Sequence, residues 1–147
     1  MKPYFTRALL VLLAWSINTS AGWQDDKDPR LNDPVVTMAV VPTYPLTALH
    51  SHTSGKAVIE VKINSEDSVI SAEKISGPAL LVGGAKYTAR RWKFAAATDG
   101  RSARVVRLSF VYHLVPRDTP IEELSAVFRP PYQVEITHVL ADETPLP

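Results

Sequence analysis

The chain has 147 residues, the length of one domain with short appendages. Its hydrophobic fraction of 46% and charged fraction of 21% are those of a globular protein and exclude a disordered one. The absence of cysteine excludes a disulfide framework, thiolate catalysis and thiolate metal sites, and no apolar run is long enough for an ordinary membrane span.

Residues 1–21 have the layout of a secretory signal peptide. A basic start precedes an apolar stretch at 8–17, which is too short to cross a bilayer, and Thr19 and Ala21 are small residues suited to a cleavage site. We expect cleavage after Ala21; an uncleaved membrane anchor is the alternative. The remaining chain would carry 14 basic and 15 acidic residues, a balance that gives no argument for nucleic acid or an anionic membrane.

The next segments predict a leader, an edge strand and a short helix. Residues 22–34 are polar and rich in aspartate, which is typical of a flexible leader. Residues 35–41 are apolar and β-branched between two prolines, so we expect an extended segment at a sheet edge. Pro45 suits the start of a helix, and Gly55 suits its end.

Two strands forming a hairpin follow. Residues 58–64 alternate cleanly between apolar and polar side chains, which predicts a strand with one buried face. Residues 65–68 are polar and predict the turn. Residues 69–75 predict the second strand, whose irregular alternation indicates a bulge.

A helix is predicted after Ser76-Gly77-Pro78. One helical face collects the apolar side chains Leu81, Ala85, Ala89 and Trp92. Gly83 and Gly84 weaken this helix, since each costs about 1 kcal/mol relative to alanine inside a helix, and fraying of the first turn is expected. Close approach of another backbone is the alternative reason for the glycines.

Residues 104–114 predict the longest strand, with Val106, Leu108 and Phe110 on one face and Arg107 and Ser109 on the other.

The tail predicts a helix and a further strand. Thr119 and Pro120 resemble a helix start, and the spacing of Ile121, Leu124 and Phe128 continues the helix to the prolines at 130 and 131. Residues 132–140 alternate again and predict a strand.

No pattern in the sequence indicates catalysis. The histidines are His50, His52, His113 and His138, and no carboxylate cluster adjoins the first two, so no metal site is predicted. There is no nucleophile-elbow serine and no glycine-rich phosphate loop. We therefore expect a non-enzymatic protein without a cofactor or a small-molecule substrate.

Basic residues form the one local charge asymmetry. The group comprises Lys86, Arg90, Arg91 and Lys93 on a basic face, followed by Arg101, Arg104 and Arg107. It could meet an acidic protein segment, lipopolysaccharide phosphates or peptidoglycan carboxylates. The alternative is an ordinary solvated surface.

Taken in order, these residues resemble the C-terminal domain of TonB-like energy transducers of Gram-negative bacteria. The matching positions are Tyr44-Pro45, Ala48, Gly55, Val58, Val61, Ile63, Val69, Ala72, Ser76-Gly77, Leu81, Ala85, Trp92, Phe94 and Phe110. The resemblance covers about half of the chain. It implies an α+β fold in which a small antiparallel sheet of three strands carries two short helices on one face. Residues 35–116 would form this domain, and 117–147 a C-terminal extension with its own helix and strand.

The resemblance also implies a partner. The family binds extended segments of outer-membrane receptors by adding them to a sheet edge. The corresponding edge here would be strand 104–114, with Arg104, Val105, Arg107, Ser109 and Val111 as partner-binding residues. Strand 132–140 could cover that edge, within one chain or across a homodimer.

Departures from the family leave the function open. The first 21 residues contain no histidine, and the chain lacks the family's long proline-rich spacer. The leading hypothesis is therefore a periplasmic binding module, linked to outer-membrane receptor transport. A genuine transducer in the inner membrane, with an uncleaved N-terminus, is the second. An envelope glycan-binding domain or small hydrolase that uses the basic face is the third.

Overall fold

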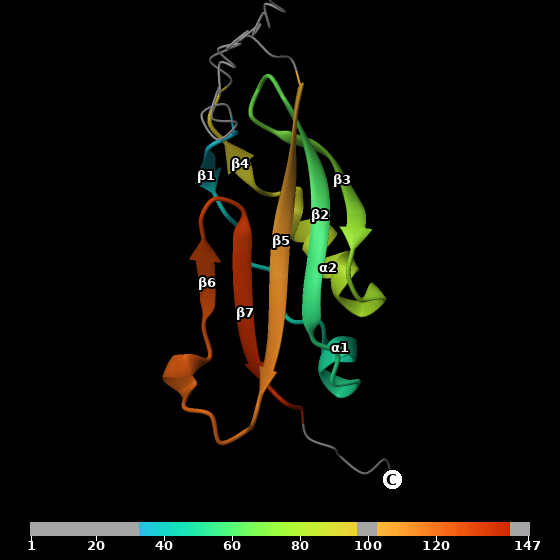
Figure 1. The fold of residues 1–147 in the computed structure, drawn as a ribbon, viewed down its shortest axis with the longest axis vertical. Coiled ribbons are helices and arrows are strands. Elements are labelled where there is room, and N and C mark those ends of the chain that lie inside the picture. Colours follow the sequence, from blue (N-terminus) through green and yellow to red (C-terminus); the bar gives the residue numbers. More distant parts are fainter. Residues whose placement is uncertain (1–32, 97–102, 142–147) are drawn as a thin grey trace, which may run out of the picture.

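The computed structural model describes residues 33–96 and 103–141. The expected signal peptide, residues 22–32 of the expected leader, Arg101 and residues 142–147 lie outside the described residues. Within the described chain, consecutive strands are separated by two short α-helices, and the fold is α+β (Figure 1).

The main sheet has five strands in the order β3-β2-β5-β7-β6 (Figure 1). Their bounds are β2 Gly55–Asn64, β3 Val69–Ser76, β5 Ala103–Val115, β6 Ala126–Arg129 and β7 Gln133–Val139. Neighbours pair antiparallel except β5 and β7, which are parallel. The sheet is therefore mixed, and the expectation of an antiparallel sheet is wrong at this one pairing.

The pairing of β2 with β5 forms the centre of the sheet. It runs without a register shift from Gly55 opposite Tyr112 to Asn64 opposite Ala103. The apolar residues that the alternation predicted point to one face, where Ile59, Val61 and Leu108 are fully buried. Alternation thus directs two adjacent strands into one core.

Two helices join the core. Helix α1 spans Leu46–His50 and helix α2 spans Ala79–Ala89, each beginning after a proline. Because proline fixes φ near the helical value, it suits the entry to a helix. Helix α2 packs against β2 and β3 and against α1.

A small second sheet closes the core. Strand β1 (Val36–Met38) pairs antiparallel with β4 (Lys93–Phe94), which confirms the extended segment expected near residue 36. Trp92 is fully buried and donates a hydrogen bond from Nε1 to the Val40 carbonyl at 2.9 Å. This contact fixes the chain before α1 beneath the end of α2.

The tail differs from its prediction in one element. Only a short 3-10 helix forms, at Ile121–Glu123, and Phe128 lies in β6 instead of on a helix. In β6 the Phe128 ring packs edge-on against Trp92, with 5.9 Å between centroids. Strand β7 confirms the predicted final strand, and it pairs with β5 inside the chain.

Candidate functional site: an unpaired half of β5

Strand β5 is the central strand of the sheet, but among the described residues only half of its second side is paired. Strand β2 pairs along residues 103–112 on one side, whereas β7 pairs only with residues 109–115 on the other. Figure 1 shows β6 and β7 beside the lower part of β5. Among the described residues, no strand pairs with residues 103–108 on that side.

The direction of the main-chain groups follows from one hydrogen bond. The Ser109 N–H donates to the Tyr132 carbonyl at 2.8 Å, on the β7 side. In an antiparallel ladder, alternate residues present both N–H and C=O to the same side. Val105 and Arg107 therefore turn their N–H and C=O away from β2, and within residues 33–96 and 103–141 these groups have no hydrogen-bond partner.

We call residues 103–108, which β7 does not cover, the half-edge. A hollow of about 360 Å³ lies at the end of the half-edge. Strand β7 does not extend along the half-edge, because the chain leaves β6 and turns at Pro130 and Pro131 before β7 begins. The hollow, here called the basic hollow, is lined by Arg107, Ser109, Arg129, Pro130, Pro131, Tyr132 and Gln133.

A second hollow of about 510 Å³ lies on the other side of the same turn. It shares Pro130, Pro131 and Tyr132 with the basic hollow, and its further lining includes Val36 and Phe128. We call it the apolar hollow. Since Phe128 packs on the core residue Trp92, this hollow opens on the core side of the sheet.

Tyr132 lines both hollows and links the β6–β7 turn to the chain before β1. Its hydroxyl donates to the Pro34 carbonyl at 2.7 Å. Burial raises the pKa of this hydroxyl to about 12, and Asp33 adds to the rise while Arg104 opposes it. The hydroxyl is therefore a stable donor at neutral pH, linking the turn to the chain that enters β1.

Each arginine of the basic hollow forms an ion pair with a glutamate. Arg107 Nε lies 3.2 Å from Glu60 Oε2, and Arg129 Nε lies 2.7 Å from Glu135 Oε2. The hydrogen bond from Arg129 holds the pKa of Glu135 below its usual range. Both arginine side chains remain more than half exposed, so their other N–H groups face solvent.

Four of the five residues predicted at the edge form two pairs, and the fifth is Arg104. Val105 and Arg107 lie on the half-edge, and both side chains are exposed. Ser109 and Val111 lie where β7 pairs with β5, as the possibility that strand 132–140 covers this edge within one chain anticipated. Contact of these residues with a partner stays a prediction.

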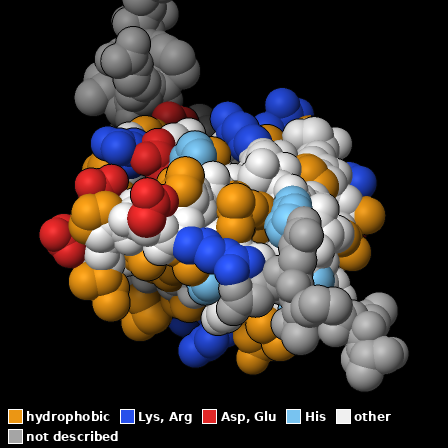
Figure 2. Space-filling model, turned by 90° about the horizontal axis from the view of Figure 1, so that it is seen from below, with side chains coloured by type: hydrophobic (Ala, Val, Ile, Leu, Met, Phe, Trp, Pro, Cys, Tyr) orange, Lys and Arg blue, Asp and Glu red, His pale blue; other side chains and the backbone are white. Residues whose placement is uncertain are grey.

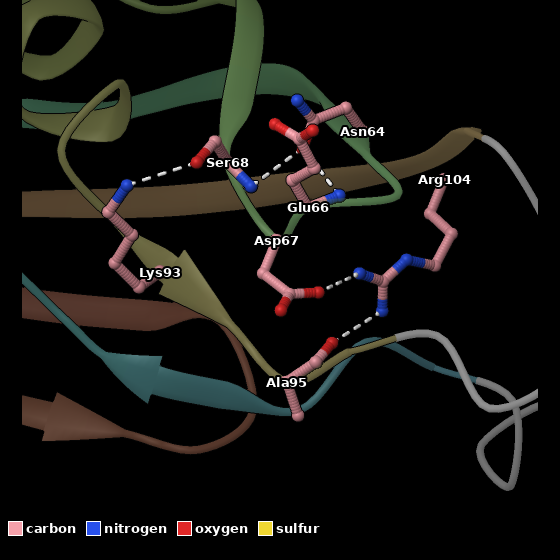
Figure 3. Close-up of polar contacts among 7 residues, drawn as sticks. All are labelled: Asn64, Glu66, Asp67, Ser68, Lys93, Ala95 and Arg104. Carbon is pink, nitrogen blue, oxygen red and sulfur yellow. Dashed lines mark hydrogen bonds and ion pairs between the residues drawn. The ribbon is translucent and has the colours of Figure 1, made fainter.

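Arg104, the fifth predicted partner-binding residue, does not face solvent. Its side chain is only 9% exposed and lies on the core side, as alternation with Val106 requires. Its guanidinium donates from Nη1 to the Ala95 carbonyl at 2.9 Å and contacts Asp67 Oδ1 from Nη2 at 3.3 Å (Figure 3). Arg104 is therefore a structural residue beneath the edge.

The predicted basic face is largely engaged with its own surroundings. Lys86 contacts Glu73 at 3.3 Å, Lys93 contacts the Ser68 hydroxyl at 3.2 Å, and Arg91 lies over the Tyr87 ring. Arg90 is exposed at the end of α2. These cations point to different neighbours, which weakens the case for a concentrated anion-binding patch.

The histidines provide no alternative site. Seen from the lower end of the molecule, histidine side chains occupy separate places around the surface (Figure 2). In the described part of the chain, no three histidine or carboxylate side chains come together in a way that could hold a metal ion. The Tyr44 ring does contact the His138 ring, with 5.8 Å between centroids.

Residues of the β6–β7 turn were not among the predicted site residues. Arg129, Pro130, Pro131, Tyr132 and Gln133 line the basic hollow. The signal available in the sequence was the proline pair directly before an alternating segment, which indicates where a strand must begin.

These features define an α+β protein with a mixed sheet, in which no described residue pairs with half of one side of β5. No protein-family model matches the chain, and no curated protein matches it either. No helix within residues 33–96 or 103–141 is long and apolar enough to cross a membrane.

Proposed function

We propose that this protein is a binding module that takes up an extended protein segment by strand addition to the half-edge. The observation that carries the proposal is that the outward N–H and C=O groups of Val105 and Arg107 have no partner among the described residues, although β5 is a central strand. Extended segments bind sheet edges through such groups, while pockets for alternate side chains give specificity.

The other two edges are less suited to this role. Strand β6 has only four residues, and its partner β7 contributes few buried side chains. The pairing of β2 with β3 contains two register shifts, and such irregularities discourage further pairing. The half-edge is regular and ends at two hollows, so it offers both backbone groups and side-chain pockets.

The resemblance to TonB C-terminal domains supports the same proposal. It implies three antiparallel strands with helices on one face, the arrangement of β3, β2 and β5 here. It also implies that a partner adds beside the strand equivalent to β5. Under this proposal the protein acts in the periplasm on an extended segment, with outer-membrane receptors as candidate sources.

The test removes a single N–H group from the half-edge. We expect Val105→Pro to weaken binding of a fluorescein-labelled neutral peptide by about tenfold, because proline cannot donate and its ring blocks approach. The neutral peptide has eight residues that alternate threonine and valine, with both ends blocked. Fluorescence anisotropy measures the affinity, and thermal melting checks the fold.

Ala126→Pro is the matched control. The Thr137 N–H donates to the Ser125 carbonyl, so alternation turns the Ala126 N–H outward, at the far edge of the sheet. This variant should bind the neutral peptide like the parent protein. Failure of the parent protein to bind, or weakening by Ala126→Pro but not by Val105→Pro, would refute strand addition at the half-edge.

A further inference from the structure

The charge of the basic hollow gives information about the segment that the half-edge would take. Of the described residues that line the hollow, two are arginines and none is acidic. Arg107 projects from β5 itself, and Arg129 projects from the end of β6. The two guanidinium groups therefore approach one space from two different strands.

The existing ion pairs leave both arginines able to bind a further carboxylate. The Arg107 side chain is 67% exposed and the Arg129 side chain 59% exposed, although each contacts a glutamate through Nε. A guanidinium has five N–H donors, so the Nη atoms can contact a second carboxylate while Nε keeps the first. Exposed ion pairs contribute little stability, so reorientation costs little.

The position of the hollow matches the end of an added strand. A segment lying along residues 103–108 would meet the β6–β7 turn end to end, because that turn blocks further pairing. Successive side chains of a strand point to opposite faces. At this end, one side chain would enter the basic hollow, and its neighbour would face the apolar hollow.

We infer that the segment carries a carboxylate at the end that meets the β6–β7 turn, next to an apolar residue. The inference rests on the proposed function and adds the chemistry of the partner. The carboxylate is an acidic side chain, because it is a side chain of the added strand that would enter the basic hollow. Arg107 and Arg129 bind it together, and the apolar neighbour packs near Phe128 and Val36.

The experiment compares charged forms of the neutral peptide. One series carries a single glutamate at each position in turn, another a single lysine, and one further peptide has a free C-terminal carboxylate. We expect glutamate at one end to tighten binding by roughly two- to fivefold, the range of an exposed ion pair. Tightening by the free C-terminus alone would overturn the assignment to an acidic side chain.

Charge-changed variants test the two arginines directly. In Arg107→Glu/Arg129→Glu, the preference should move from glutamate to lysine at the same peptide position. Arg107→Gln/Arg129→Gln should bind both series equally, and it avoids placing new carboxylates beside Glu60 and Glu135.

The matched control is Lys56→Glu/Lys74→Glu, which makes the same change in net charge at exposed positions that do not line the hollow. It should keep the glutamate preference.

The outcomes separate the two proposals. Equal binding of glutamate and lysine peptides, with Val105→Pro still weakening the neutral peptide, would overturn the carboxylate inference alone. An unchanged glutamate preference in both arginine variants would do the same. Absence of binding by every peptide would overturn the proposed function.

Discussion

Arg104 joins three parts of the fold through one side chain. Its guanidinium contacts Asp67 in the β2–β3 turn and the Ala95 carbonyl after β4, as Figure 3 shows. Asp67 has a φ of 67°, a left-handed conformation that aspartate and asparagine tolerate better than most residues. Asn64 completes the turn, because its Oδ1 accepts from the N–H groups of Glu66 and Ser68.

We expect Asp67→Asn to destabilise the protein by about 1–2 kcal/mol. Asparagine keeps the left-handed turn but leaves the nearly buried Arg104 charge without its carboxylate. The estimate is below the value for a fully buried pair, because the Asp67 side chain is 31% exposed and solvent weakens the interaction. Urea-induced unfolding measures the change.

Arg104→Met supplies the control for this pair. In a double-mutant cycle, Asp67→Asn should lower the free energy of unfolding much less in the Arg104→Met background. In that background there is no guanidinium charge left without its carboxylate. Equal costs in both backgrounds would show that Asp67 acts through the turn alone.

At the scale of elements, the glycines around α2 have opposite roles. Gly77 has a φ of 125°, and an added Cβ would lie 2.7 Å from the Ala57 Cα, so glycine is required between β3 and α2. Gly83 lies inside α2, where an added Cβ would meet no atom of the described residues within 4 Å. At Gly84 the nearest described atoms lie 3.9 Å away. Packing therefore gives no reason for the glycine pair inside the helix.

We expect Gly83→Ala to stabilise the protein by about 0.5–1 kcal/mol, since alanine loses less conformational freedom in a helix. Gly77→Ala should instead destabilise it by at least about 1–3 kcal/mol through backbone strain, before the clash with Ala57 is counted. Thermal and urea unfolding of both variants provides the comparison. A loss of stability in Gly83→Ala would indicate a packing role for Gly83.

Alternation in the sequence predicted β2, β5 and β7 because each buries one face against a shared core. It could not predict that β7 pairs parallel to β5, since alternation identifies a face and not a neighbour or a direction. The helical spacing of Phe128 gave a wrong prediction, because Phe128 lies in β6 with its ring packed on Trp92. The half-edge depends on where the β6–β7 turn stops β7, which is a tertiary property.

At the scale of the whole molecule, β7 raises the question of whether a partner must displace it. Strand β7 buries Val134 and Ile136 in the core, and Tyr132 binds the Pro34 carbonyl. Displacement would expose these side chains and the edge beyond Ser109. The half-edge, in contrast, can accept a short strand while β7 stays in place.

A disulfide between β5 and β7 distinguishes these two modes. Val111 and Glu135 are register partners, so a cysteine pair at these positions can form a cross-strand bridge. The natural chain has no cysteine, so no other disulfide can form within it. We expect the oxidised Val111→Cys/Glu135→Cys variant to bind the neutral peptide with the same affinity as its reduced form, measured by fluorescence anisotropy. Loss of binding on oxidation, restored by reduction, would show that the segment replaces β7, and the half-edge would then be the start of the binding site.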